Sequence, residues 1–122
     1  MTPARRVLVV DDDPEVLDFL EVLLSVEGIA TLRASGAREA LDRIEDGVGL
    51  VLVDIAMPGV DGLELCRRIK ASPGTASLPV VVLSARPGQV AASEALSAGA
   101  DDFLRKPFDN DELLALVRGK LL

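Results

Sequence analysis

Five short apolar runs alternate along the chain with five stretches in which apolar residues recur at helical spacing. The runs occupy 7–10, 30–34, 50–54, 79–84 and 102–106, and the helical stretches occupy 14–27, 36–46, 62–71, 88–98 and 110–121. The first, third and fourth runs are almost continuously apolar, which is typical of parallel strands covered by helices on both faces. With right-handed crossovers, this alternation predicts a doubly wound α/β sandwich, (βα)5, around a five-stranded parallel sheet.

Length, charge and cysteine content narrow the class of protein. The 122 residues suit a single domain, 1–122, with one packed core. A net charge of −7, three Phe, no Trp and no Tyr argue against direct nucleic-acid binding by this domain. No apolar run is long enough to cross a membrane, and the single cysteine, Cys66, cannot form an internal disulfide. We therefore expect a cytoplasmic domain without membrane contact.

Polar side chains stand where the apolar runs end. Asp11–Asp13 follow the first run, Asp54 ends the third, Ser84 ends the fourth and Lys106 ends the fifth. In doubly wound sheets the ligand crevice lies at the carboxyl ends of the strands. The fold therefore predicts that these residues converge, although they are distant in sequence.

Such a group of residues suits magnesium and phosphoryl chemistry. Carboxylates crowded in one crevice repel one another, and their pKa values rise unless a cation compensates. Oxygen ligands without histidine or thiol favour Mg²⁺, and Lys106 can add a second positive charge. A cation, a lysine and a spare carboxylate make a site for a phosphoryl group, with Asp54 as a candidate nucleophile.

A simpler interpretation gives these residues structural roles only. Asp11–Asp13 could cap the helix of 14–27, and Asp13 is expected to do so. Cys66, Phe19 and Phe108 are predicted to be packing residues. The capping interpretation does not explain why four strand ends carry polar groups at once.

The segments "VVDDD", "LVDIAMPGVDG", "VLSA" and "LRKPF" resemble, in this order, those of two-component response-regulator receiver domains, the CheY-like family. The resemblance covers about residues 5 to 121. It implies a sheet of order 2-1-3-4-5 and a phosphoacceptor domain that a histidine kinase or histidine phosphotransfer protein phosphorylates. Such a domain is not an enzyme, apart from catalysing its own phosphotransfer and autodephosphorylation.

The resemblance also assigns roles around the phosphorylation site. It implies that Asp11 and Asp12 bind Mg²⁺, and that Asp54 is both the phosphoacceptor and a metal ligand. The backbone carbonyl of Ala56 would be a further ligand. The side chains of Ala56 and Arg86 would flank the phosphoryl group and tune its lifetime.

A second set of residues would transmit the signal. The resemblance implies that Ser84 and Lys106 contact the phosphoryl group, that Phe103 is the aromatic switch residue, and that the Lys106–Pro107 peptide bond is cis. The changed surface would span helix 88–98, strand 102–106 and helix 110–121. A downstream protein, a fused output domain or a second protomer would dock there.

The identity of the output partner is less defined. Ala92, Ser97 and Leu116 stand where winged-helix transcription regulators of this family often carry interface charges. These residues lower the expectation of that output class. The sequence does not identify the stimulus or the cognate kinase.

Three other functions compete with this one. A Mg²⁺-dependent phosphatase of the haloacid dehalogenase type also uses a nucleophilic Asp, but it needs an acid two residues later, where this chain has Ala56. A degenerate receiver would act as a binding module only, and the complete set of motif residues argues against it. A flavodoxin-like binder should offer hydroxyls and glycines in its first loop, where this chain has three carboxylates.

Overall fold

The five strands form one parallel sheet, as the sequence predicts. The computed structural model describes residues 6–44, 47–54, 61–84, 88–106 and 108–121. The strands are β1 (Arg6–Val10), β2 (Thr31–Ala34), β3 (Val48–Asp54), β4 (Val80–Ser84) and β5 (Asp102–Arg105). They lie in the order β2-β1-β3-β4-β5, and every neighbouring pair is parallel. The predicted sheet order is therefore confirmed.

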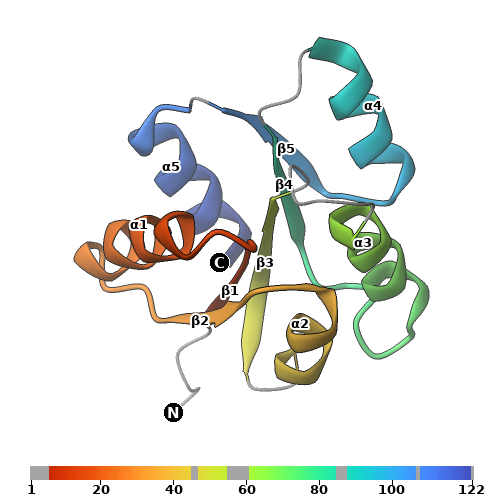
Figure 1. Cartoon of the computed structure of the whole chain (residues 1–122), viewed down its shortest axis with the longest axis horizontal. Coiled ribbons are helices and arrows are strands. Elements are labelled where there is room, and N and C mark those ends of the chain that lie inside the picture. The colour runs from red at the N-terminus through yellow and green to blue at the C-terminus, as the bar shows by residue number, and fades with distance from the viewer. Residues whose placement is uncertain (1–5, 45–46, 55–60, 85–87, 107, 122) are drawn as a thin grey trace.

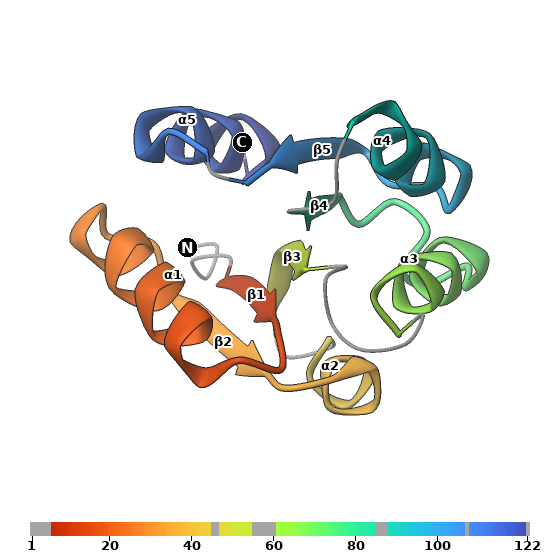
Figure 2. The same cartoon turned by 45° about the horizontal axis from the view of Figure 1, so that its top comes forward.

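Helices cover both faces of the sheet. They are α1 (Pro14–Val26), α2 (Ala37–Arg43), α3 (Asp61–Ala71), α4 (Gly88–Ser97) and α5 (Asn110–Leu121). Figures 1 and 2 show α1 and α5 on one face, and α2, α3 and α4 on the other. The predicted helix of 36–46 was too long, because Gly36 is an extended N-cap residue and the helix ends at Arg43. None of the helices that the structure describes is long and apolar enough to cross a membrane.

The core has two parts, one on each face of the sheet. In β1, Val7 and Val9 pack with α1 and α5, whereas Leu8 and Val10 pack with the helices of the opposite face. All four are at most 1% exposed. Because both faces are buried, the strand is apolar from Val7 to Val10, and the first polar residue after it marks the edge of the core.

The first helix begins immediately beyond that edge. The Asp13 side chain accepts a hydrogen bond of 2.9 Å from the backbone N–H of Glu15, and Pro14 occupies the first helical position. Gly28 ends the helix with φ +77°, a conformation that glycine adopts without strain. The capping role predicted for Asp13 is confirmed. This tight turn keeps Asp11 at the end of β1.

A polar clamp holds the opposite end of the sheet. The Lys70 ammonium lies 2.6 Å from Asp101 and donates a hydrogen bond of 2.8 Å to the carbonyl of Leu78. Asp101 in turn accepts 2.8 Å from the backbone N–H of Val80, at the start of β4. The clamp joins the end of α3 to the starts of β4 and β5.

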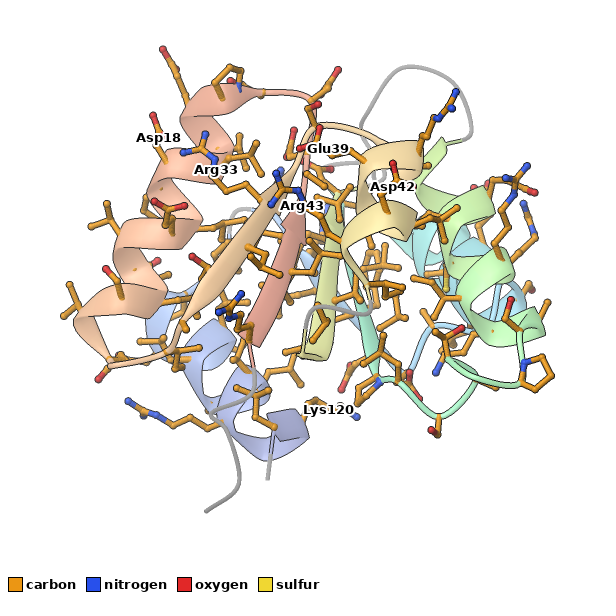
Figure 3. All side chains as sticks on the ribbon, turned by 90° about the horizontal axis from the view of Figure 1, so that it is seen from below. Asp18, Arg33, Glu39, Asp42, Arg43 and Lys120 are labelled. Carbon is orange, nitrogen blue, oxygen red and sulfur yellow. The ribbon has the colours of Figure 1, made fainter. Side chains whose placement is uncertain are left out.

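We expect Asp101→Ala to lower the free energy of unfolding by about 1–3 kcal/mol, because the Val80 N–H and the Lys70 ammonium both lose their acceptor. Urea unfolding measures this. Asp18→Ala is the matched control, since it removes only the exposed ion pair of 2.6 Å with Arg33 (Figure 3), and such pairs contribute about 0–1 kcal/mol. Equal losses in the two variants would contradict a structural role for the clamp.

Candidate functional site

The polar strand ends meet at one edge of the sheet. Asp11 follows β1, Asp54 and Ser84 are the last residues of β3 and β4, and Lys106 follows β5. Asp11, Asp54 and Ser84 are 2%, 4% and 0% exposed. The structure therefore brings together four residues that the sequence singled out. Buried polar groups carry a desolvation cost, which makes this edge the strongest candidate for a functional site.

Lys106 connects three strand ends. Its ammonium donates a hydrogen bond to Asp54 Oδ2 and lies 3.9 Å from Asp11 Oδ2. Its backbone N–H donates a hydrogen bond of 2.8 Å to the carbonyl of Ser84. The lysine thus places one positive charge beside two buried carboxylates, which leaves the group of three with excess negative charge.

Asp11 is incompletely compensated in this group. Its Oδ1 accepts a hydrogen bond of 2.9 Å from the Asp13 N–H, whereas its buried Oδ2 has no donor within hydrogen-bond reach among the described residues. Burial, a hydrogen bond shared with Asp54 and the charge of Asp54 raise the pKa of Asp11 from 3.8 to about 7. The Asp13 N–H and the Lys106 charge offset this only in part.

The residues present fit Mg²⁺. Asp11 Oδ2 is a buried oxygen that lacks a donor among the residues that the structure describes, and Asp54 supplies a second carboxylate beside it. Within the described part of the chain, no three side chains of the metal-binding types cluster closely enough to form a complete site, and Asp12 is exposed. Two protein carboxylates with water in the remaining positions is the kind of site that Mg²⁺ accepts.

The remaining predicted site residues differ in how far the structure describes them. Ala56, Arg86 and Pro107 lie outside the described residues, so their predicted roles stay predictions. Phe103 lies on β5, paired in register with Val82, and is partly buried against the core on the α2–α4 face. It is therefore two residues along the sheet from Ser84.

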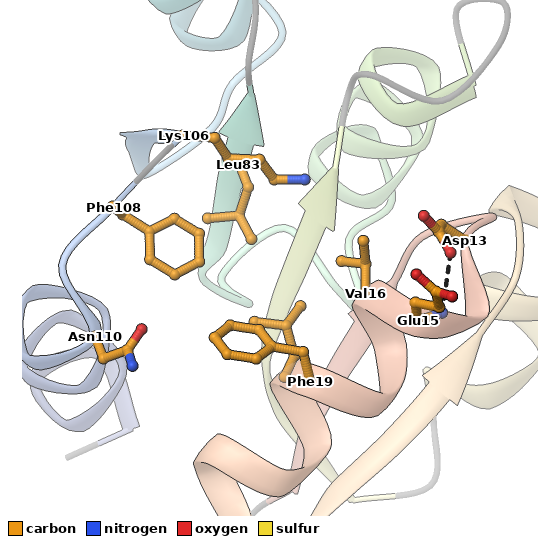
Figure 4. A pocket seen from close by; sticks show the side chains of 9 residues that line it. Asp13, Glu15, Val16, Phe19, Leu83, Lys106, Phe108 and Asn110 are labelled. Carbon is orange, nitrogen blue, oxygen red and sulfur yellow. Dashed lines mark hydrogen bonds between the residues drawn. The ribbon is translucent and has the colours of Figure 1, made fainter.

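A pocket that the sequence pattern does not predict lies beside this site. Phe19 was predicted to be a packing residue, but its exposed fraction is 48%. It lines a pocket between α1 and the segment leading into α5, together with Phe108 and Lys106 (Figure 4). The apolar spacing of α1 alone could not reveal this, because it does not show how closely α5 approaches. Cys66 is buried, as predicted.

Comparison with known proteins identifies the family. The family model for the response regulator receiver domain matches residues 7–118. The chain is 41% identical over 118 residues to the uncharacterized transcriptional regulatory protein YrkP of Bacillus subtilis, covering 97% of this chain and 50% of that protein. It is 38% identical over 121 residues to the DNA-binding response regulator MtrA of Mycolicibacterium smegmatis, covering 98% and 52%. The chain spans about half the length of these curated relatives.

Solved structures show the same fold. A response regulator receiver protein from Pseudomonas putida matches with a TM-score of 0.88 and 35% identity, over 98% of this chain and 99% of that one. A CheY-like receiver domain protein from Methanospirillum hungatei matches with a TM-score of 0.86 and 30% identity, over 98% and 94%. The chain belongs to the response regulator receiver domain family of two-component systems, with the CheY-like fold, and is a signalling module and not an enzyme.

Proposed function

We propose that Asp54 accepts a phosphoryl group from a histidine kinase or a histidine phosphotransfer protein, and that this changes the surface formed by α4, β5 and α5. One observation carries the proposal. Asp54 lies at the edge of the sheet in contact with the Lys106 ammonium, beside the buried Asp11 Oδ2, which has no hydrogen-bond donor among the described residues. This combines a nucleophile, a cation and an oxygen ligand for a metal in one crevice.

The transfer requires little covalent chemistry from the protein. A carboxylate oxygen of Asp54 attacks phosphorus, the bond from phosphorus to the donor's imidazole nitrogen breaks, and the imidazole keeps that electron pair. Bound Mg²⁺ would be held by Asp11 and Asp54, with Asp12 and the Ala56 carbonyl as proposed further ligands, and would neutralise charge on the phosphoryl oxygens. Lys106, already at Asp54, adds a second positive charge there.

Acetyl phosphate provides the direct test. With Mg²⁺, we expect intact-mass spectrometry to show one added phosphoryl group that is labile in base, as an acyl phosphate should be. With the metal chelated, we expect no addition. Labelling that is independent of Mg²⁺ would contradict the proposed site, and no labelling under any condition would support a degenerate receiver that acts only as a binding module.

Ser84→Ala is expected to uncouple phosphorylation from the distant surface. The phosphoryl group adds about two negative charges and several acceptors, and the buried Ser84 hydroxyl can donate to it only by moving toward Asp54. Phe103 would then fill the space left behind, because an apolar void forfeits contacts. α4 can follow, since the buried side chains of Ala95 within it and of Ala98 directly after it are small.

Beryllofluoride, a phosphoryl mimic, allows this to be measured by NMR. In the wild-type protein, amide shifts should extend from Asp54 through residues 84 to 106. In Ser84→Ala, labelling of Asp54 should persist while the distant shifts diminish several-fold. Wild-type shifts confined to the loops around Asp11, Asp54 and Lys106 would contradict this route of transmission.

We infer that a downstream protein, a fused output domain or a second protomer reads the phosphorylation, and the observations on the class of output conflict. The names of the curated relatives describe transcriptional and DNA-binding regulators about twice as long as the matched region. Ala92, Ser97 and Leu116 weigh against an output domain of the winged-helix class. Size-exclusion chromatography with and without beryllofluoride would test the third option, a dimer that forms through α4, β5 and α5.

A further inference from the structure

We propose that the pocket between α1 and the start of α5 binds a small organic molecule that joins a flat apolar ring to a positively charged group. The pocket has a volume of about 560 Å³, within the range of about 300–1,000 Å³ that is usual for small-molecule sites. Binding in this pocket does not depend on the proposed phosphorylation of Asp54, although Lys106 lines the pocket and also contacts Asp54.

The wall of the pocket is apolar and contains two aromatic rings. Val16 and Leu20 contribute from α1, and Leu83 contributes from β4. Figure 4 shows the rings of Phe19 and Phe108 facing the space from opposite sides, one from α1 and one from the segment before α5. Two rings placed in this way can sandwich or flank a third, and aromatic contacts prefer such offset or edge-to-face arrangements.

The polar groups of the pocket favour a cation. Asp13 and Glu15 line the end near the start of α1, and Asn110 lines the opposite side (Figure 4). The fourth polar group, Lys106, has its charge directed to the buried carboxylates Asp54 and Asp11. The pocket is therefore left with uncompensated negative charge, which attracts a cation and repels an anion. Aromatic faces add cation–π attraction.

A second copy of this chain is a poorer occupant than a small cation. The exposed apolar residues of α1, Phe19, Val22 and Val26, could in principle contact another protomer. The same helix carries acidic residues at Glu15 and Asp18, and the whole chain has a net charge of −7. Two such surfaces would repel each other.

The test titrates the unphosphorylated chain with 2-phenylethylammonium as the probe. Binding is measured from the amide NMR shifts of the protein. We expect saturable binding with a dissociation constant on the order of 1 mM, with shifts centred on Val16, Leu20 and Leu83. 3-Phenylpropionate has the ring with the opposite charge, and n-butylammonium has the charge without the ring. Both should bind at least about tenfold more weakly.

Variants test the contribution of the aromatic rings and that of the negative charge separately. Phe108→Ala should weaken binding of 2-phenylethylammonium about fivefold or more. Phe19→Ala, at a position whose side chain is 48% exposed, should do the same. Glu15→Gln should weaken binding of 2-phenylethylammonium about threefold and should not weaken binding of 3-phenylpropionate. Val26→Ala, on the same helix outside the pocket, is the matched control and should change nothing.

Three results would overturn the proposal. One is equal affinity for 3-phenylpropionate and 2-phenylethylammonium, which would show that the charge has no role. Another is the absence of saturable shifts at the pocket. The third is a set of shifts at Val16 and Leu83 that depends on protein concentration without any probe, which would show that a second copy fills the pocket.

Discussion

Asp54→Asn is expected to abolish phosphorylation by acetyl phosphate completely. The amide matches the carboxylate in size, so the edge of the sheet should keep its packing, but the neutral amide is not a nucleophile for phosphorus at neutral pH. The amide oxygen still offers Lys106 an acceptor at this position, and Asp11, 3.9 Å from Lys106 in the wild-type protein, is unchanged. Intact-mass spectrometry after incubation with acetyl phosphate and Mg²⁺ measures the effect.

Asp12→Asn serves as the matched control for that variant. It removes a carboxylate from the same loop, but from an exposed position. We expect it to weaken Mg²⁺ binding in calorimetry and to slow labelling without abolishing it. A label that persists in Asp54→Asn would refute the assignment of Asp54, and an unchanged Mg²⁺ titration in Asp12→Asn would show that this residue is not a ligand.

The convergence of the site residues could be predicted because it follows from topology. Asp54, Ser84 and Lys106 each stand where an apolar run stops, and the carboxyl ends of parallel strands meet at one edge. Neither the position of these residues at the strand ends nor the meeting of the strand ends at one edge requires knowledge of side-chain geometry. Capping at Asp13 could be predicted for a similar reason, because the cap, the proline and the helix are adjacent in sequence.

Properties that depend on packing between distant elements could not be predicted. Whether Phe19 is covered depends on how near α5 comes to α1, and the spacing within α1 carries no information on that distance. The same holds for Lys106, because the sequence places its ammonium near the crevice but does not choose between Asp11 and Asp54. Burial raises the pKa of Asp11, and the Lys106 ammonium, 3.9 Å away, offsets that rise only in part.

The raised pKa of Asp11 leads to the second large prediction. We expect Asp11→Asn to stabilise the protein at pH 7.5 by about 2–4 kcal/mol in the absence of Mg²⁺. In the unfolded chain, Asp11 releases its proton near pH 3.8, whereas in the folded chain it keeps the proton until about pH 7. Between these values the folded state binds more protons, so stability falls as the pH rises. Below pH 3.8 both states are protonated and this loss is absent.

Urea unfolding at pH 5.0 and 7.5 measures the effect. The wild-type protein should lose stability between these two values, and Asp11→Asn should lose distinctly less, because its amide does not titrate. Asp42→Asn, an exposed carboxylate on α2, is the control and should follow the wild type. A wild-type stability that rises over this interval would contradict the raised pKa of Asp11.

Magnesium provides an independent check on the same carboxylate. If Asp11 is a ligand, Mg²⁺ binds the folded state with its deprotonated carboxylate and should restore stability to the wild-type protein at pH 7.5, in proportion to the logarithm of its concentration above the dissociation constant. Asp11→Asn should gain much less, since the amide has no charge with which to hold the cation. The carboxylate that destabilises the metal-free crevice would then be the one that binds the ion, which explains why Asp11 Oδ2 can be buried without a hydrogen-bond donor among the described residues.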